Sequence, residues 1–598
     1  MSVSQAGAVY PMKLSVLVFA AASAWSLSAC QQIEAPNSVT VEAPAIAETA
    51  TPWTKGAMVA AADPRAVEAG LEIIRNGGHA VDAAIAVHSV LGLVEPQSSG
   101  LGGGAFMLVY DRETGKTSVY DGRETAPMAA DENLFIQDGE VLGFFEAWQS
   151  GRSTGVPGAV ALYGAAHADY GMVEWPRLFD SAIQLADDGF VVSPRLAAVL
   201  ENPRLRGATR LDEHPASAAY FYPGGEPLAE GAVRDNAAYA AVLRLVAADG
   251  ADAFYRGDIA EAIVAGVAEA PLAGAMTVAD IEAYEVVIRE PLCGTWRVYE
   301  ICSAPPPSSG GVTQNMITGL YDRLLPADAD SEEAFLKAFV DAQRLAYADR
   351  DHYVADADFV TVPAAELIDP DYLDARALDV FDPAAKPLPG DPGAVLGTGS
   401  MIGMWGQDST EHAPGTTHVS IIDSYGNAVS MTATVEAAFG NSRMVHGFLL
   451  NNELTDFARE ARKSDLPLAN APAGGKRPRS SMSPTLIFDE QGDLVMVTGS
   501  PGGNSIVAYV AKTIIGVLDW GKSAQDATAL PNIIARGEQV NVEVDREGGP
   551  EVAQALRDMG YNVLERRGEN SGLHVIVVRD DGLEGGADPR REGVARQP

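Results

Sequence analysis

Residues 413–436 read APGTTHVSIIDSYGNAVSMTATVE, and this stretch decides how the chain is expected to fold. After Thr416 apolar and polar residues alternate, which is typical of a half-buried β-strand. Residues 424–426 are Ser-Tyr-Gly, a three-residue loop with Gly426 at the position that takes a left-handed conformation. The stretch therefore predicts an antiparallel hairpin whose first strand begins at Thr416.

The register of this hairpin decides which side chain lies beside Thr416. If Asp423 pairs with Asn427, Thr416 falls directly opposite Thr434, on the same face, with Cβ atoms about 5 Å apart. Thr434 would then hydrogen-bond the Thr416 hydroxyl and orient it. A register shift of one residue would turn Thr434 to the other face of the sheet.

Thr416 itself is a candidate nucleophile. A threonine hydroxyl attacks poorly unless a base lies beside it. Cleavage of the peptide bond between Gly415 and Thr416 would free the α-amine of Thr416, and that amine would act as the base. The competing interpretation is a threonine that merely starts a strand, and the surrounding motifs argue against it.

Further motifs follow in a fixed order along the chain. Downstream of the hairpin stand LLNNELTDF (449–457), RPRSSMSPT (477–485) and TGSPGG (498–503). Upstream stand PQSSGLGGGAFMLVYD (96–111), YDGRETAP (120–127), GVPGAVALYG (155–164), PPPSSGG (305–311) and YADRDHYVADADF (347–359). Together, from about Gly56 to the ADPR around Pro589, they resemble the γ-glutamyltransferases (γ-glutamyl transpeptidases, glutathione hydrolases), which are N-terminal-nucleophile hydrolases. The ordered set is far more specific than any single glycine-rich piece.

The resemblance implies an α+β fold, a four-layer αββα sandwich in which two stacked, mostly antiparallel sheets are flanked by helices. It also implies self-processing. Thr416 would attack the carbonyl of Gly415, which has no side chain to obstruct it, and the resulting ester would hydrolyse. The products would be a large subunit, 56–415, and a small catalytic subunit, 416–598, together forming one αββα unit.

The resemblance implies a reaction on γ-glutamyl compounds. The γ-glutamyl amide of glutathione and related compounds would be cleaved through a γ-glutamyl-threonyl ester, which water or an amino-acid or peptide acceptor would resolve. No metal or organic cofactor is expected. Arg123, Ser480 and Ser481 match residues that hold the α-carboxylate of the glutamyl group; otherwise an arginine is usually in a surface salt bridge and such serines in a polar turn.

The resemblance also assigns acidic residues to the α-ammonium of the glutamyl group. Asp456 corresponds to the residue that binds the α-ammonium, Glu453 would assist it, and Glu436 would add negative charge. Without the resemblance, Glu453 and Asp456 would be placed in a solvated loop. Opposite charges at two ends of the pocket would select an amino-acid head group.

A glycine pair completes the expected catalytic set. LVMVTGSPGGN (494–504) resembles a strand that runs into a turn, and a helical stretch follows. Backbone N–H groups of Gly502 and Gly503 at a helix start favour negative charge. Such donors stabilise a tetrahedral intermediate by about 3 kcal/mol each. The competing interpretation is a plain strand-to-helix turn.

The segment between Asp456 and Lys476 departs from some family members. It reads FAREARKSDLPLANAPAGG, contains no tyrosine, and is shorter than the lid loop of some bacterial relatives. A more open pocket is expected, and hydrolysis is expected to compete well with transfer.

The first thirty residues are expected to direct export. MKLSVLVFAAASAWSLSAC (12–30) has an apolar run too short for a membrane span, as in signal peptides. Leu-Ser-Ala-Cys at 27–30 resembles a bacterial lipoprotein cleavage box, so 1–29 would be removed and Cys30 lipidated. An ordinary secretory signal with an incidental cysteine is the alternative.

The residues after Cys30 indicate where in the cell the protein is expected. Gln31 resembles the outer-membrane sorting pattern, which implies a periplasmic lipoprotein anchored to the outer membrane of a Gram-negative bacterium. Residues 30–55 are rich in Ala, Pro, Thr and Glu and would form a flexible tether. The start is open between Met1 and Met12, because residues 1–11 add no charge to the signal.

Two further cysteines lie in EPLCGTWRVYEICSAPPP, at Cys293 and Cys302. The segment alternates like a short hairpin, on which the two positions would face each other. After export a disulfide is expected, and two free buried thiols are the alternative. A metal site is not expected, since no Cys or His cluster accompanies them.

The net charge of the chain limits the kinds of molecule that it is expected to bind. The chain has 598 residues, of which 42 are Lys or Arg and 81 Asp or Glu, giving a net charge of −39. This charge argues against nucleic acid or an anionic membrane surface as a partner, so membrane contact is expected only through the lipid anchor. The length is sufficient for a large buried core.

Two other functions compete with the γ-glutamyl reaction. One is a glutaryl or β-lactam acylase on the same scaffold, against which Arg123 and Asp456 favour an α-amino-acid head group. The other is an uncleaved, inactive surface lipoprotein that only binds peptides. Thr416, Thr434 and the glycine pair argue against the binding protein.

Overall fold

The structure of the protein is a computed structural model. It describes residues 52–598 except 270–271, 330, 380–381, 411–414 and 569–570. The expected signal peptide, Cys30 and most of the expected tether lie outside the described residues.

The predicted hairpin lies in the middle of the larger sheet. β11 (Thr416–Ile422) and β12 (Ala428–Thr434) pair antiparallel, with Thr416 opposite Thr434. Gly426 in the connecting loop has a φ of 88°, in the left-handed region. The predicted register is confirmed.

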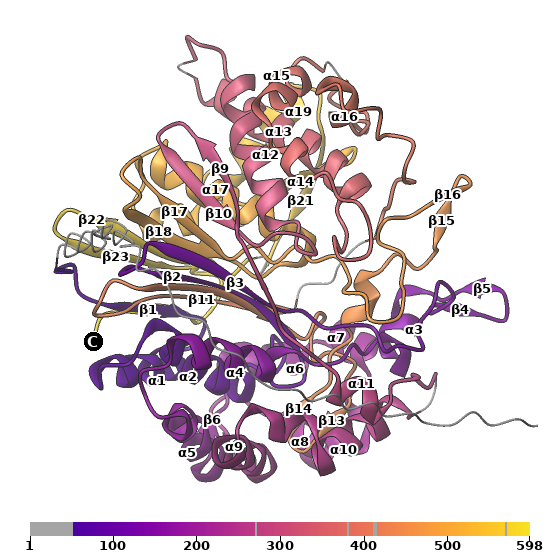
Figure 1. Ribbon diagram of the computed structural model, residues 1–598, viewed down its shortest axis with the longest axis vertical. Helices are drawn as coiled ribbons and strands as arrows, with labels where there is room; N and C mark the ends of the chain where they lie inside the picture. Colours follow the sequence, from indigo (N-terminus) through magenta and orange to yellow (C-terminus); the bar gives the residue numbers. More distant parts are fainter. Residues whose placement is uncertain (1–51, 270–271, 330, 380–381, 411–414, 569–570) are drawn as a thin grey trace, which may run out of the picture. The chain divides into compact units, whose positions relative to one another are not determined.

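Two antiparallel sheets are stacked in the middle of the fold (Figure 1). The larger has the order β24-β1-β11-β12-β2-β3-β8, and its other strands are β1 (Met58–Ala61), β2 (Gly104–Asp111), β3 (Lys116–Gly122), β8 (Val287–Arg289) and β24 (Val594–Arg596). The smaller has the order β23-β22-β18-β17-β10-β9, with β9 (Leu292–Trp296), β10 (Tyr299–Ser303), β17 (Thr485–Phe488), β18 (Leu494–Gly499), β22 (His574–Arg579) and β23 (Gly582–Ala587).

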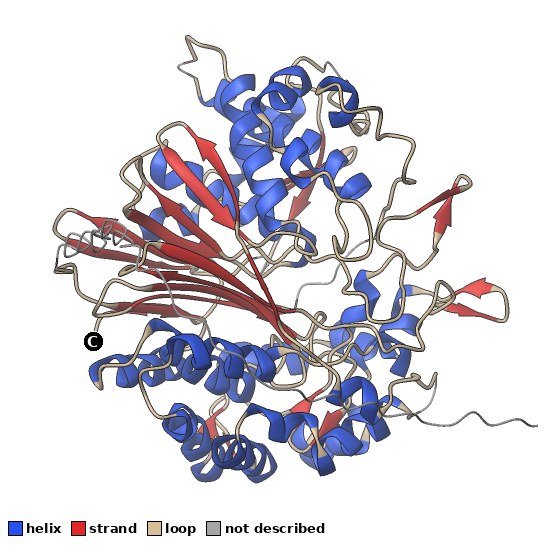
Figure 2. Cartoon of the chain, in the orientation of Figure 1, coloured by secondary structure: helices blue, strands red, loops and turns tan. Residues whose placement is uncertain are grey.

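Helices cover the outer face of each sheet (Figure 2). Below the larger sheet lie α1 (Pro64–Arg75), α2 (Ala80–Val94) and α4 (Ala159–Tyr170), and above the smaller sheet lie α12 (Gly310–Leu324), α13 (Glu332–Tyr353) and α17 (Ile506–Leu518). The order of layers is αββα, as predicted. One core joins α1, α2 and α4 to the larger sheet, and a second joins both sheets to α12, α13 and α17.

The remaining elements surround these layers. The other helices are α3 (Phe144–Gln149), α5 (Asp180–Asp188), α6 (Pro194–Glu201), α7 (Pro203–Thr209), α8 (Pro215–Phe221), α9 (Ala237–Asp249), α10 (Gly257–Val267), α11 (Val278–Glu282), α14 (Ala364–Leu367), α15 (Pro370–Arg376), α16 (Pro392–Val395), α18 (Ala524–Ala529) and α19 (Gly549–Asp558). A three-stranded sheet contains β19 (Ile533–Arg536), β20 (Gln539–Glu543) and β21 (Asn562–Arg566). Two-stranded pairs are β4 (Ile136–Gln137) with β5 (Glu140–Val141), β6 (Phe190–Val191) with β7 (Val233–Arg234), β13 (Met444–Val445) with β14 (Phe448–Leu449), and β15 (Arg462–Lys463) with β16 (Leu466–Pro467).

The two expected subunits share the larger sheet. Strands β1, β2, β3 and β8 precede residue 415, whereas β11, β12 and β24 follow it. β11 pairs with β1 and β12 pairs with β2, so the strand that begins at Thr416 is flanked within the sheet. Neither part contains this sheet alone.

The two cysteines lie on the hairpin β9–β10. Cys293 and Cys302 are directly paired residues and are joined by a disulfide. Their sulfurs are therefore not the free thiols of the alternative interpretation. Among the described helices, none combines the length and apolar character that a membrane crossing requires.

Candidate active site

Thr434 connects the candidate nucleophile to the peptide bond that precedes it. Its hydroxyl donates to the carbonyl oxygen of Gly415 at 2.8 Å and accepts the Glu436 N–H at 2.8 Å. Thr416 Oγ1 lies 3.2 Å from Thr434 Oγ1. Because a threonine hydroxyl has only one hydrogen, Thr416 must be the donor in this last contact.

Gly415 is held against the turn that follows β12. A Cβ at this position would lie 2.4 Å from the Glu436 oxygen and 2.5 Å from the carbonyl carbon of Ala437. Both are backbone atoms that cannot move aside like a flexible side chain. Glycine therefore allows the carbonyl before Thr416 to reach Thr434.

Arg591 holds the backbone of Thr416 from the other side. Its Nη1 donates to the Thr416 carbonyl oxygen at 2.9 Å. A Cβ at Gly572 would lie 2.7 Å from Arg591 Cδ, so this glycine leaves room for the side chain. Sequence reasoning missed Arg591, although it directly follows the ADPR motif.

One small cavity brings the predicted residues together. Its lining residues are Arg123, Thr416, Thr434, Glu436, Glu453, Asp456, Ser480, Ser481, Met482, Gly503 and Ile506. Gly502 is not among these lining residues, but it directly precedes Gly503 in the chain. Its φ of 136° is a value that favours glycine. The cavity measures about 20 Å³, roughly the room of one water molecule.

The charges in this cavity are not separated as the sequence predicted. Arg123 Nη2 donates to Asp456 Oδ2 at 2.6 Å, and its Nη1 forms an ion pair with Glu453. The expectation that Arg123 and the acids lie at opposite ends is therefore not met. The physical reason is burial, because a charge taken out of water is costly unless an opposite charge contacts it.

Glu124 lies next to these ion pairs, but unlike Glu453 and Asp456 it makes no close contact with Arg123. Its carboxylate is fully buried, 3.9 Å from Arg123 Nη1, and within the described residues neither of its oxygens has a hydrogen-bond partner. Burial raises the pKa of Glu124 to about 8, against the opposing effect of Arg123. Burial also raises the pKa of Asp456, which Arg123 opposes.

The motif LLNNELTDF positions the acidic residues. Asn452 Nδ2 donates to Glu436 Oε2 at 2.9 Å, and Asn452 Oδ1 accepts the Ala437 N–H at 2.9 Å. Asn451 Oδ1 accepts the N–H of Glu453 at 3.0 Å. The two asparagines were not predicted as supporting residues, because only the fold shows that they bind the turn after β12.

Ser480 and Ser481 are fixed from two directions. Ser480 N–H donates to Pro307 O at 2.9 Å, so the turn 305–311 packs against this part of the site. Ser481 Oγ accepts from Arg350 Nη2 at 2.5 Å and lies 3.4 Å from Asn504 Oδ1. Arg350 was not predicted, since its motif contributed only to the family resemblance.

The segment 457–475 lies beside the cavity. It contains the exposed hairpin β15–β16, and the Gly406 N–H donates to Pro467 O at 2.8 Å. Asn470 Nδ2 donates to Asp456 O at 2.7 Å. Of the described residues that line the cavity, none belongs to 457–475.

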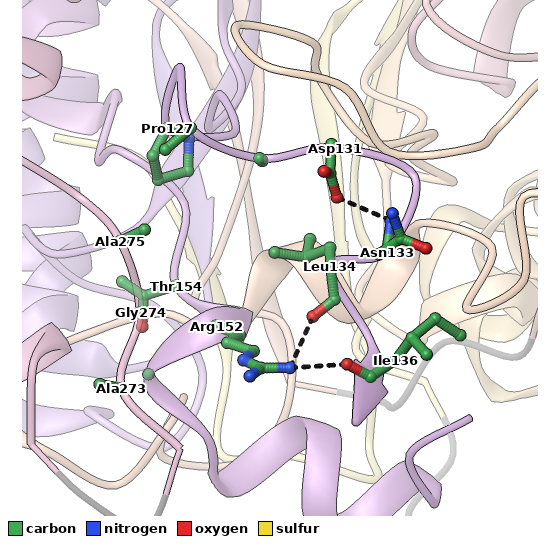
Figure 3. A pocket seen from close by; sticks show the side chains of 13 residues that line it. Pro127, Asp131, Asn133, Leu134, Ile136, Arg152, Thr154, Ala273, Gly274 and Ala275 are labelled. Atoms are coloured by element: carbon green, nitrogen blue, oxygen red, sulfur yellow. Dashed lines mark hydrogen bonds between the residues drawn. The ribbon is translucent and has the colours of Figure 1, made fainter. Parts of the chain in front are cut away.

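A larger cavity lies outside this set of residues (Figure 3). It measures about 280 Å³ and is lined by the loop 127–136, Arg152 and residues 273–275 among others. Arg152 Nη1 donates to Ile136 O at 3.1 Å, and its Nη2 donates to Gln137 Oε1 at 2.8 Å. The Arg152 guanidinium is bound by the protein itself, and none of the residues that line the smaller cavity lines this one.

Among the described residues, one group of three His, Cys, Asp or Glu side chains lies close enough together to share a metal ion. It consists of Cys293, Glu300 and Cys302. The disulfide occupies both sulfurs, so they are not available as thiolate ligands. This group does not fit a metal.

Comparisons with known proteins agree with the site. The sequence profile of the Gamma-glutamyltranspeptidase family matches residues 66–597. The glutathione hydrolase proenzymes of Bacillus subtilis (strain 168) and Escherichia coli (strain K12) are each 33% identical, over 551 and 548 residues; each match covers 90% of this chain, and 91% and 90% of those proteins. The crystal structure of a cephalosporin acylase from Bacillus halodurans is similar with a TM-score of 0.78 and 25% identity, covering 93% of this chain and 98% of that one.

Proposed function

This chain belongs to the γ-glutamyltranspeptidase family, and from this premise we propose that it is a self-processing γ-glutamyl hydrolase and transferase. Its substrates are glutathione and related γ-glutamyl compounds. The observation that carries the proposal is the contact of Thr434 with both Thr416 Oγ1 and the Gly415 carbonyl, beside a cavity lined by Glu436, Glu453 and Asp456.

Self-processing is the first step. Thr416 Oγ attacks the carbonyl carbon of Gly415, and Thr434 accepts its proton while donating its own hydrogen to the carbonyl oxygen. The C–N bond then breaks as the carbonyl re-forms, and the proton on its oxygen passes to the nitrogen. The nitrogen leaves as the α-amine of Thr416, and an ester remains between Gly415 and the side-chain oxygen of Thr416. Water hydrolyses this ester and separates the parts 56–415 and 416–598.

Turnover uses the same hydroxyl with a new base. The freed α-amine takes the hydroxyl proton as Thr416 attacks the γ-carbonyl of the donor, and passes it to the leaving amine. The N–H groups of Gly502 and Gly503 stabilise the oxyanion. Water or an amino acid or peptide acceptor resolves the γ-glutamyl-threonyl ester.

The charged residues of the cavity bind the amino-acid head group. Asp456, with Glu453 and Glu436, binds the α-ammonium, and Arg123 binds the α-carboxylate. Because Arg123 contacts Asp456 and Glu453, the head group inserts between them and replaces these ion pairs. A small, self-paired cavity thus opens on substrate binding.

The main alternative is an acylase, which the similarity to the Bacillus halodurans structure favours. A glutaryl donor has no ammonium, and it would leave the acids of the cavity unpaired at a cost of a few kcal/mol. We expect purified protein to hydrolyse L-γ-glutamyl anilide with a higher kcat/KM than glutaryl anilide. A preference for the glutaryl donor would establish the acylase instead, and a persistent full-length band without turnover of either donor would establish a peptide-binding protein.

The chain is also proposed to be exported and anchored by lipid at Cys30. A disulfide such as Cys293–Cys302 persists in oxidising compartments outside the cytosol, which supports export. Metabolic labelling with a fatty acid tests the anchor. The label is expected on the wild type and not on Cys30→Ala, and equal labelling of both would refute the lipidation site.

A further inference from the structure

Five charged side chains form a connected cluster that reaches the cavity at Ser481. Arg350 Nη1 donates to Asp351 Oδ1 at 2.7 Å, and Arg536 Nε donates to the other oxygen, Asp351 Oδ2, at 2.9 Å. Arg479 Nη2 donates to Asp408 Oδ2 at 2.7 Å, and the Asp408 N–H donates to the Asp351 carbonyl at 3.3 Å. Four of the five side chains are at most 7% exposed, and Arg536 is 18% exposed.

The cluster has more positive than negative charge. Burial works against the ionised form of Asp351, but Arg536, Arg350 and Arg479 together lower its pKa to about 2. Burial and the neighbouring Arg479 lower the pKa of Arg350 to about 10, which keeps it charged at neutral pH. Three guanidiniums therefore face two carboxylates, and a buried excess charge is costly without a counter-ion.

The hydrogen bonds at Ser481 direct this excess charge toward the cavity. Arg350 Nε donates to Ser309 Oγ at 3.1 Å, and its Nη2 donates to Ser481 Oγ. Since Ser481 accepts from the guanidinium, its own hydrogen is left to donate, and the acceptor within reach, Asn504 Oδ1, is 3.4 Å away. A carboxylate oxygen in the cavity would be a far stronger acceptor.

Arg123, by contrast, is matched by negative charge. Its two terminal nitrogens contact Asp456 and Glu453. The positive charge of Arg350 acts on the cavity from the side of Ser481, where it works against the burial that raises the pKa of Asp456. Arg350 reaches this side from helix α13, which precedes the turn around Ser481 by more than a hundred residues.

We infer that Arg350 is a positioning residue that makes the Ser481 side of the cavity positive and selects donors with an α-carboxylate. It acts through Ser481, whose hydroxyl it fixes as a donor toward that carboxylate. The inference rests on the proposed γ-glutamyl reaction, since it names how one end of that donor is recognised.

The test compares two donors that differ only in the α-carboxylate. L-γ-glutamyl anilide carries it, and 4-aminobutyryl anilide lacks it. For Arg350→Gln the ratio of kcat/KM between the two donors should fall about 10- to 100-fold, the loss of one hydrogen bond to a charged group, with the change mostly in KM for the γ-glutamyl donor. Arg344→Gln, a buried arginine of the same helix that donates to Gly537 O and Ala385 O, should leave the ratio unchanged.

A second variant changes the charge in the opposite direction. Asp351→Asn removes a carboxylate bound to Arg350 and should raise the donor ratio several-fold. A ratio that stays at the wild-type value in either processed variant overturns the inference, and so does failure of both variants to process, because the cluster would then serve folding. If the wild type itself does not turn over the γ-glutamyl donor, the proposed function fails, which is a different result.

Discussion

At the residue scale, the hydrogen bonds of Thr434 fix the positions of two protons. Its single hydrogen is given to Gly415 O, so the Thr416 hydroxyl must point its own hydrogen at Thr434. The proposed nucleophile and the carbonyl that it would attack are therefore bound to one side chain. The hydrogen bond from Thr434 to the Gly415 carbonyl depends on glycine at position 415, because a Cβ there would collide with the backbone of Glu436 and Ala437.

Gly415→Ala should slow self-processing about 10-fold or more. The added Cβ would meet the backbone at Glu436 and Ala437, and a displacement of about 1 Å at a reacting bond can cost a hundredfold in rate. The measurement is the time course of the fragment that begins at Thr416. Gly403→Ala is the control, because its Cβ meets no atom within 4 Å. Processing of Gly415→Ala at the wild-type rate would contradict the expected clash.

Glu124→Gln should raise thermal stability, increasingly so as the pH rises from about 4.5 to about 8. The folded protein keeps this carboxyl protonated up to about pH 8, whereas the unfolded chain ionises near its ordinary value of 4.5. Between these values the unfolded state binds fewer protons, so wild-type stability falls with pH by at most about 1.4 kcal/mol per unit. The glutamine variant has no such loss.

The melting temperatures of both proteins at several pH values provide the measurement. The exposed Glu113→Gln is the control, and it should track the wild type at every pH. A difference between Glu124→Gln and wild type that is constant from pH 5 to 8 would show that Glu124 is ionised in the fold.

At the scale of single elements, local sequence was sufficient for the hairpin but not for its surroundings. The register of β11 and β12 followed from alternation and from Gly426, because turn geometry and a buried face together specify pairing. The ion pairs of Arg123 could not be predicted in this way. Its partners Glu453 and Asp456 lie 330 and 333 residues further along the chain, and only packing decides that they meet.

The position of the segment 457–475 bears on the ratio of hydrolysis to transfer of the γ-glutamyl group. The structure does not show the more open pocket that was expected, because the cavity measures about 20 Å³. No described residue of 457–475 lines the cavity, so we still expect this segment to leave the γ-glutamyl ester accessible to water once substrate has opened the site. With a γ-glutamyl anilide and a dipeptide acceptor at modest concentration, the hydrolysis product should exceed the transfer product. Chromatographic quantification of both products gives the ratio, and transfer equal to or above hydrolysis would contradict this expectation.

At the scale of the whole molecule, the larger sheet makes separation of the two parts costly. β11 and β12 pair with β1 and β2, which lie on the other side of the proposed cleavage site, and the two buried cores described above contain residues from both parts. The order of layers was predictable from the family resemblance, because seven or more motifs fix the family. The charge cluster around Arg350 was not, since Ser481, Asp408 and Arg536 come from separate segments.

The processed fragments should therefore remain together under native conditions. Size-exclusion chromatography should give one peak that contains both fragments, and denaturing guanidinium chloride should separate them. Native elution of the fragment 416–598 in a peak of its own would show that strand pairing across the cleavage site is weaker than the sheet implies.

The proposed self-cleavage that frees Thr416 is tested most directly by intact-mass spectrometry of the purified protein, measured alongside turnover of L-γ-glutamyl anilide. The wild type should give two polypeptides, one of which begins at Thr416, and should turn over the donor. Thr416→Ala should remain one chain and be inactive. Two fragments or full turnover from Thr416→Ala would contradict the assignment of Thr416 as nucleophile and base.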